Sequence, residues 1–283
     1  MDDPYLTPGD VLRNRLGITD SAQLQQAEGE YSTIRLYELQ QRSLLENYDL
    51  KDLQTVHHFI FQDVYDWAGK LRTIPLSKRE YEDRGLISHF TVPRQLVEHG
   101  NLILTRIGKP MDFRNRSTQD MANHLGEICK YLNTLHPFRE GNGRALRAFM
   151  FDFVKNAGKF LSFEGISRER WIRASIQAHH GDNAMLIRIF SEILDTEAHR
   201  RFQAIKPTFD KMRNDGAWDW HDYYISVPPP GATVDGTAAI ITDDIIVVRT
   251  GEGRIELIRP DSIRYTPQVK DHIVMIETER APE

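Results

Sequence analysis

Apolar residues recur at helical spacing through most of the first two-thirds of the chain. In residues 119–135 they fall on one face of a helix: Met121, Leu125, Ile128, Cys129, Leu132 and Leu135. Ser117 and Thr118 stand just before this segment, and hydroxyl side chains at that place predict a helix N-cap. We therefore expect a helix that packs this face into a core.

A second helix is predicted over residues 144–158. Its apolar stripe consists of Leu146, Phe149, Met150, Phe153 and Val154. Phe151 adds apolar surface on another side, so we expect this helix to be buried on most faces at the centre of its domain. Gly158 favours the end of the helix. Further helical patterns run through residues 167–180 and 183–205.

The helical pattern stops in two places. Residues 67–93 carry Gly69, Pro75, Gly85 and Pro93 between short alternating runs, which predicts a hairpin or an irregular flap. After Phe202, short β-branched runs alternate with Gly, Pro and Asp, and residues 244–258 predict a strand, a turn and a strand. About five short strands in this part predict a small β-barrel or sheet, with an OB-like barrel as one candidate.

Composition narrows the class of protein. The chain has 283 residues, of which 40% are hydrophobic and 27% charged, as in an ordinary globular protein. Its net charge of −5 does not favour generic nucleic-acid binding. Cys129 is the single cysteine, so no internal disulfide forms, which fits a reducing compartment. The sequence contains no run of 18 apolar residues, so no membrane-spanning helix is predicted. The polar N-terminal segment MDDPYLTPGD does not resemble a Sec-type signal peptide.

Candidate chemistry is concentrated in the stretch HPFREGNGRALR, His136 to Arg147. A histidine at the end of a helix can serve as a general base near neutral pH. The following GNG segment lets the backbone approach a ligand, and the N-terminus of the next helix attracts anions. Arg144 and Arg147 lie three residues apart on that helix, so both can point toward one polyphosphate.

Glu140 does not fit a simple anion site, because a carboxylate repels phosphate. A Mg²⁺ ion between the two resolves the conflict, since Mg²⁺ takes carboxylate and phosphate oxygens together. The set then suits phosphoryl or nucleotidyl transfer, in which positioning and charge stabilisation dominate. The chemistry alone leaves open a second interpretation, a polar turn with two surface arginines.

The same stretch resembles the Fic-domain signature HxFx(D/E)GNGRxxR. It matches all eight defined positions: His136, Phe138, Glu140, Gly141, Asn142, Gly143, Arg144 and Arg147. The segment DVYDWAGKLRTIPLSK before it is similar to the part of the family that forms a flap, and ASIQAHHGDNAMLIRIF after it is similar to the closing helices. The resemblance covers roughly residues 35–200.

The resemblance implies transfer of AMP from ATP to a hydroxyl of a target protein. His136 would deprotonate a Ser, Thr or Tyr hydroxyl, and Glu140 would hold Mg²⁺ between the α- and β-phosphates. The Gly141–Asn142–Gly143 segment would cradle phosphate. Arg144 would pair with the β-phosphate, and Arg147 would hold the γ-phosphate and so orient the α-phosphorus for in-line attack. Phe138 would pack the loop into the core.

The resemblance also implies a flap over residues 70–78 that aligns a target segment by strand addition. The flap residues expected to meet the target are Lys70, Leu71, Arg72, Thr73, Ile74, Pro75 and Leu76. The basic side chains of this region, Lys70, Arg72, Lys78 and Arg79, predict either a solvated hairpin or contact with an acidic target surface.

The N-terminal segment PYLTPGDVLRNRLGI resembles the start of the Bartonella effector proteins (Beps), in which an OB fold and a BID secretion domain follow the Fic domain. The implied fold is mainly α: an N-terminal extension (1–34), a Fic helical bundle with a β-hairpin flap (35–205) and a small C-terminal all-β OB-like barrel (206–283). The implied location is the bacterial cytoplasm before type IV export into a host cell. The sequence ends at Glu283 before any BID-like helical region, and whether such a region follows in a longer protein stays open.

Fic enzymes are commonly inhibited by a helix with the pattern (S/T)xxxE(G/N). Five glutamates of this chain precede Gly or Asn, and none has Ser or Thr four residues earlier. We therefore expect no inhibitory helix in the chain, and a separate antitoxin-like protein as a possible inhibitor.

Other interpretations stay open at this point. Fic-type transfer of UMP or phosphocholine is one alternative, because the motif reads phosphates and not the base. A non-catalytic target-binding module is the other, although intact His136, Glu140, Arg144 and Arg147 argue against it. The pairs His57–His58 and His179–His180 lack the neighbours of a metal site, which favours solvent-facing or capping roles.

Overall fold

The structure is a computed structural model that divides into two compact units. It describes residues 3–42, 44–80, 86–216, 219–220, 223–229, 231–251, 253–263 and 266–276. Unit 1 comprises Met1–Lys159 and Ser175–Ile187, and unit 2 comprises Phe160–Ala174 and Arg188–Glu283. None of the helices within these ranges is both long and apolar enough to cross a bilayer.

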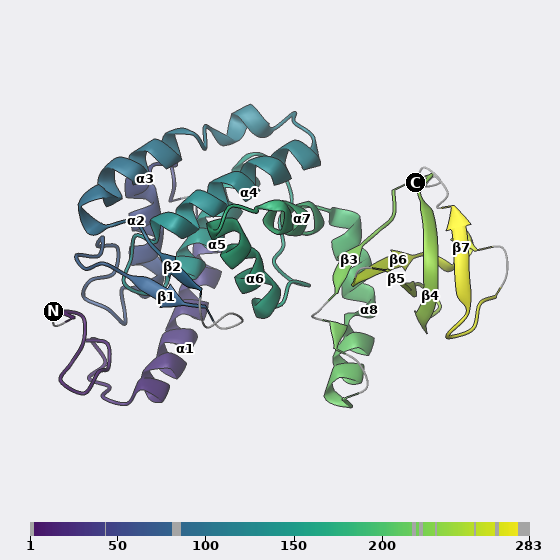
Figure 1. The fold of residues 1–283 in the computed structure, drawn as a ribbon, viewed down its shortest axis with the longest axis horizontal. Coiled ribbons are helices and arrows are strands. Elements are labelled where there is room, and N and C mark those ends of the chain that lie inside the picture. The colour runs from purple at the N-terminus through teal and green to yellow at the C-terminus, as the bar shows by residue number, and fades with distance from the viewer. Residues whose placement is uncertain are drawn as a thin grey trace. The chain divides into compact units, whose positions relative to one another are not determined.

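Helices dominate the first two-thirds of the chain, as predicted (Figure 1). Their bounds are α1 (Ser21–Gln40), α2 (Leu50–Phe61), α3 (Leu96–Thr105), α4 (Thr118–Leu135), α5 (Asn142–Asn156), α6 (Arg168–His179), α7 (Ala184–Ile193) and α8 (Thr196–Asn214). The helical pattern of residues 183–205 is divided between α7 and α8. The break follows from Asp195, whose carboxylate accepts hydrogen bonds from the Glu197 and Ala198 amides and caps α8.

Helix α5 lies at the centre of unit 1 and contacts α1, α2 and α4 (Figure 1). All five residues of its predicted stripe are buried, which confirms the expected central position. Ser117 caps α4 by accepting a hydrogen bond from the Asp120 amide. Gly158 follows α5 with a φ of 70°, a left-handed conformation that favours glycine. The helices on both sides of the signature are therefore placed by ordinary hydrophobic packing and capping.

The irregular region before the signature contains a short antiparallel strand pair. Strand β1 (Ser77–Arg79) pairs with β2 (Ile87–His89), and Ser77 lies opposite His89. This pairing agrees with the predicted hairpin. Gly85, on which part of that prediction rested, lies outside the described residues.

Unit 2 contains one five-stranded sheet of order β3-β6-β5-β4-β7. The strands are β3 (Tyr224–Ser226), β4 (Thr233–Ile241), β5 (Ile246–Thr250), β6 (Arg254–Ile258) and β7 (His272–Ile276). Strands β5 and β6 pair antiparallel across the predicted turn, which confirms the strand–turn–strand prediction for residues 244–258. Only the pairing of β3 with β6 is parallel among the described strands.

A closed barrel is not found in the described part of the chain, so the predicted OB-like barrel is not confirmed. Strands β3 and β7 form the two edges of the sheet, and no described pairing joins them. The packing of α8 gives a physical reason. Phe202, Ile205 and Phe209 of α8 share a buried cluster with Val247 and Leu257 of the sheet, so a helix covers one face.

The opposite face of the sheet has its own apolar cluster, which includes Val234, Ile246, Val248 and Ile273. The predicted limit between residues 205 and 206 lies within α8. The division into an extension, a Fic domain and an OB-like domain stays a prediction.

Candidate active site

The signature forms the turn between the C-terminus of α4 and the N-terminus of α5. His136 is the C-cap of α4, and its backbone is left-handed, with φ 45° and ψ 61°. Its amide donates a hydrogen bond to the Leu132 carbonyl at 3.1 Å. Gly141 is the N-cap of α5, with φ 80°. A candidate base and a helix N-terminus are thereby joined by one short loop.

Asn142 closes this loop with its side chain. Its Nδ2 donates to the Phe138 carbonyl at 2.8 Å, and its Oδ1 accepts from the Phe138 amide at 2.9 Å. Phe138 is buried, in agreement with the expected packing role, and its ring stacks on His57 with centroids 3.8 Å apart. The Asn142 side chain therefore braces the loop, and the amides of Gly143 and Arg144 remain at the start of α5, where a helix has no internal acceptors.

His57 ties the loop to the beginning of the flap. Its Nδ1 accepts a hydrogen bond from the Gly69 amide at 2.8 Å, so the proton resides on Nε2, which donates to the Glu140 carbonyl at 2.9 Å. The ring is fully buried, and burial lowers the pKa of His57 to about 4. The solvent-facing interpretation is therefore wrong for His57, because both ring nitrogens are used inside the protein.

The other histidine pair lies near the flap. Nδ1 of His179 is 3.3 Å from the Thr134 hydroxyl, and Nε2 of His180 is 3.4 Å from the Ser88 hydroxyl. Within the described ranges, no group of three or more His, Cys, Asp or Glu side chains is placed to hold a metal ion.

Gly141 is required by space as well as by its backbone conformation. A Cβ at this position would lie 2.4 Å from the Cε2 and Cζ atoms of Phe61. Phe61 is fully buried in α2. The loop thus lies directly on the core, and the GNG segment depends on glycine at its first position.

Arg144 is held by α1, a contact that the sequence did not indicate. Its guanidinium forms an ion pair with the buried Glu28, donates to the Ser32 hydroxyl at 3.0 Å and lies over the Phe61 ring at 4.7 Å. The second carboxylate oxygen of Glu28 accepts a hydrogen bond from the Tyr65 hydroxyl. The one available signal was spacing, since Leu24, Glu28 and Ser32 lie on one buried face of α1.

Arg147 lies one turn further along α5 and is partly buried. A Cβ added at Gly143 would lie 3.4 Å from its Nη1 atom, so the guanidinium lies against the first turn of α5. Both arginines therefore lie in the first two turns of α5, while the guanidinium of Arg144 contacts Glu28 and Ser32 of α1. That both point toward one polyphosphate stays a prediction.

Glu140 is the exposed acidic group of the loop, with 48% of its side chain accessible. Its Oε1 accepts a hydrogen bond from the Gly141 amide at 2.9 Å and lies 4.0 Å from the Arg144 guanidinium. One accessible carboxylate beside an anion site fits a Mg²⁺ ion that arrives with nucleotide phosphates. It does not fit a protein-only cage, which needs more oxygen ligands.

The environment of His136 keeps the imidazole neutral. Burial lowers its pKa to about 3, and the charge of Arg72 acts in the same direction, followed by Lys78 and His179. The main chain of Asn133 opposes these effects. The ring stacks on Phe90, with centroids 3.9 Å apart and planes at 15°. A neutral, oriented imidazole is the state that can accept a proton.

The predicted flap residues divide into exposed and buried side chains. Lys70, Thr73 and Pro75 are exposed, whereas Leu71, Ile74 and Leu76 are partly buried. Arg72 is only 2% exposed, so its side chain cannot meet an acidic target surface, and that interpretation is wrong for this residue. Lys78 and Arg79 remain exposed on β1.

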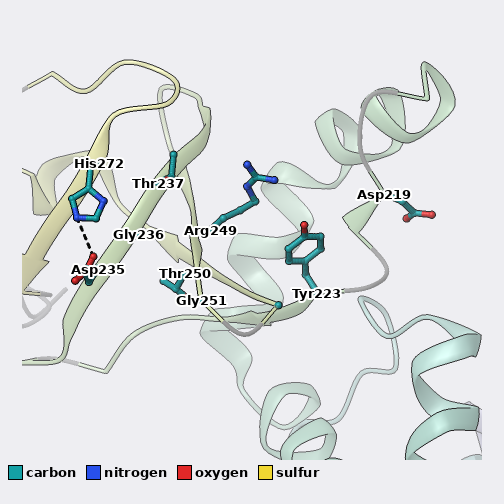
Figure 2. Close-up of a pocket in the computed structure, with 10 residues that line it drawn as sticks. Asp219, Tyr223, Asp235, Gly236, Thr237, Arg249, Thr250, Gly251 and His272 are labelled. Carbon is teal, nitrogen blue, oxygen red and sulfur yellow. Dashed lines mark ion pairs between the residues drawn. The ribbon is translucent and has the colours of Figure 1, made fainter.

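Unit 2 has a separate surface hollow of about 890 Å³ against the sheet (Figure 2). Arg249 and Tyr223 line it, and His272 forms an ion pair with Asp235 at 3.1 Å on neighbouring strands. None of its polar side chains is buried, and both signs of charge are present. It lacks the convergent polar groups of a specific small-molecule site.

Comparison with known proteins matches residues 47–154 to the Fic/DOC family. The chain is 32% identical over 193 residues to a probable protein adenylyltransferase Fic of Escherichia coli, covering 68% of this chain and 92% of that protein. It is 33% identical over 186 residues to the protein adenylyltransferase VbhT of Bartonella schoenbuchensis. That match covers 65% of this chain and spans 37% of the length of VbhT.

Solved structures give the same fold. The type IV secretion system effector protein BepA has a TM-score of 0.75 and 24% identity, and the match covers 99% of this chain and 97% of that one. The N-terminal Fic domain of a Bartonella quintana Bep effector with bound ADP has a TM-score of 0.61 and 25% identity, covering 67% of this chain and 93% of that one.

Proposed function

The chain belongs to the Fic/DOC family, and from this premise we propose that it transfers AMP from Mg·ATP to a Ser, Thr or Tyr hydroxyl of a target protein. Membership of this family confirms the resemblance of residues 136–147 to the Fic-domain signature. The relatives at 32–33% identity are named protein adenylyltransferases, which supports this class of enzyme.

One observation carries the proposal. A neutral histidine and the N-terminus of a helix with two arginines are held in a single braced loop. His136 supplies a proton acceptor, and the start of α5 supplies amides, dipole and guanidinium groups for a polyphosphate. These are the two functions that nucleotidyl transfer to a hydroxyl requires.

The reaction follows from this arrangement. His136 accepts the proton of the target hydroxyl while the hydroxyl oxygen forms a bond to the α-phosphorus. The bond from the α-phosphorus to the bridging oxygen breaks, and pyrophosphate leaves. The negative charge of the bound nucleotide favours the imidazolium that forms, which offsets the low pKa of His136 in the free protein.

Positions at the start of α5 are proposed to bind the phosphates. The backbone of Gly141, Asn142 and Gly143 would cradle them, Arg144 would pair with the β-phosphate and Arg147 with the γ-phosphate. The ADP in the Bartonella quintana structure supports a nucleotide as the substrate class. Glu140 would hold Mg²⁺, which when bound neutralises phosphate charge.

The flap is proposed to align the target. A segment of the target would add as a strand along residues 70–78, so that backbone hydrogen bonds place its hydroxyl near His136. The proximity of the flap to the ring supports this idea, because Phe90 next to β2 stacks on His136.

Three further proposals rest on the resemblance to Bartonella effectors. An OB-like fold of residues 206–283 would serve as a scaffold or partner-binding domain. A separate antitoxin-like protein would supply the inhibitory glutamate. The protein would act in a host cell after type IV export, and the overall fold shared with BepA supports this.

The test uses several nucleotides in parallel. The protein is incubated with Mg²⁺, a cell lysate and ATP, UTP or CDP-choline in separate reactions, and modified proteins are identified by mass. The proposal predicts addition of one AMP unit, in the ATP reaction. Addition of UMP or phosphocholine instead would identify the alternative transfer, and no modification with any donor would favour a non-catalytic binding module.

A further inference from the structure

Arg72 is a buried cation whose partners are main-chain carbonyls. Its Nε donates to the His136 carbonyl at 2.8 Å, and its Nη1 donates to the Ile74 carbonyl at 2.7 Å. Its Nη2 donates to the Thr91 carbonyl and lies 3.4 Å from that of Leu135. Within the described ranges, no carboxylate lies within ion-pair distance of its guanidinium. Burial lowers the pKa of Arg72.

Burial of a charged guanidinium is unfavourable unless the surrounding groups replace the hydrogen bonds that water would make with it. A charge taken out of water loses its hydration, which only well-placed hydrogen-bond acceptors can replace. Here the carbonyls of Leu135 and His136 belong to the C-terminus of α4, which carries the negative end of the helix dipole. Arg72 thus stabilises the end of the helix from which the candidate base projects.

The four carbonyls come from three separate segments. Leu135 and His136 lie where α4 meets the signature loop, Ile74 lies in the leg of the flap before β1, and Thr91 lies in the leg after β2. The Arg72 amide also donates to the Pro137 carbonyl at 2.9 Å. One residue therefore connects the loop with both legs of the flap.

His136 needs such support because its backbone conformation is unfavourable. A non-glycine residue at φ 45° is strained and persists only where surrounding contacts fix it. Arg72 fixes the carbonyl of His136, and Phe90, which precedes Thr91, fixes the ring. Both contacts reach His136 from the flap.

We infer that Arg72 is a positioning residue that sets His136 and both legs of the flap in one geometry, so that the proton acceptor and the target-aligning segment are placed together. The inference rests on the proposed function. It assigns to a residue outside the signature a role in catalysis that acts through His136.

Two variants separate the geometry of Arg72 from its charge. Arg72→Lys keeps the positive charge but offers a compact ammonium in place of the planar fork, so it cannot hold the same set of carbonyls. Arg72→Gln removes both charge and fork. Arg170→Gln is the matched control, because Arg170 is also buried, but its partners are Glu192 and the Tyr223 carbonyl in unit 2.

The first measurement is the pKa of His136 by NMR titration of the ring, which needs no enzymatic activity. The charged groups acting on His136 are Arg72, Lys78 and His179. Arg72→Gln should raise the pKa of His136, while Arg72→Lys and Arg170→Gln should leave it unchanged. A purely structural role would not produce this difference between Gln and Lys.

The second measurement is the rate of AMP transfer with labelled ATP. Both Arg72 variants should lose about 100-fold in kcat, the loss expected for misplacement of a catalytic group by about 1 Å, with little change in KM for ATP. Arg170→Gln should lower Tm without this loss.

Thermal melting shows which variants fold. If Arg72→Gln does not fold, Arg72→Lys carries the test through its kcat. A folded Arg72→Lys with wild-type kcat, or a folded Arg72→Gln with an unchanged His136 pKa, would overturn the inference. A wild-type protein without AMP transfer would count against the proposed function alone, because the titration still reports on Arg72.

Discussion

Substitution of Gly141 by Ala tests how closely the loop lies on the core. Two penalties apply to this change. A side chain at φ 80° costs about 1–2 kcal/mol, and a Cβ placed 2.4 Å from Phe61 forces a rearrangement of a packed core that costs about 1–3 kcal/mol. Together they predict a loss of about 2–5 kcal/mol in the free energy of unfolding of unit 1.

Gly143→Ala is the matched control within the same motif. Gly143 is helical, and an added Cβ would meet only Arg147 Nη1 at 3.4 Å. Alanine is favoured over glycine in a helix by about 1 kcal/mol, so this variant should be as stable as the wild type or slightly more stable.

Urea unfolding followed by circular dichroism measures both variants. Gly141→Ala should unfold at a much lower urea concentration than the wild type. In thermal unfolding its Tm should fall by roughly 4–20 °C. In a Phe61→Leu background, which lacks the clashing ring atoms, the penalty of Gly141→Ala should shrink by about 0.5–3 kcal/mol. Equal stability of the Gly141→Ala and Gly143→Ala proteins would refute the reasoning.

Two other predictions concern groups that hold the site. Glu28→Gln should lower the free energy of unfolding by about 2–3 kcal/mol, because it removes the close anionic partner of a largely buried Arg144 and leaves it only Glu140 at 4.0 Å, whereas the exposed Glu30→Gln on the same helix should change it little. Urea unfolding of the two variants compares them, and equal effects would contradict the role of the Glu28 pair. The lowered pKa of His57 should by itself decrease the free energy of unfolding by about 3 kcal/mol as pH falls from 6.5 to 4, because His57 is neutral in the folded protein and gains a proton on unfolding, and His136 acts in the same direction. Denaturation at several pH values measures how the free energy of unfolding changes with pH. This change should be smaller in His57→Gln than in the wild type, and an equal change would argue against the role of His57.

Much of unit 1 could be predicted because its signals are local. The 3.6-residue periodicity placed α4 and α5, Ser117 marked the beginning of α4, and the signature lies between them. The position of both arginines at the start of α5 followed from their spacing. Such features depend on residues that are close together in the chain.

Contacts between distant segments could not be predicted. Glu28 and Arg144 are 116 residues apart, and nothing in the local pattern of either indicates the other. Arg72 stands among exposed basic residues, so its burial depends on where the α4 carbonyls lie. Closure of the C-terminal strands into a barrel likewise depends on long-range pairing, and α8 occupies one face of the sheet.

The central claim is that His136 promotes transfer of the AMP group itself. The most direct measurement compares ATP labelled at the α-phosphate with ATP labelled at the γ-phosphate, using the wild-type protein and His136→Ala in the same lysate. Relative to lysate without the protein, we predict additional labelled protein only from α-labelled ATP and only with the wild type, while His136→Ala still binds ATP in calorimetry because its phosphate-binding residues are intact. Additional label from γ-labelled ATP, or additional label that persists in His136→Ala, would contradict the account.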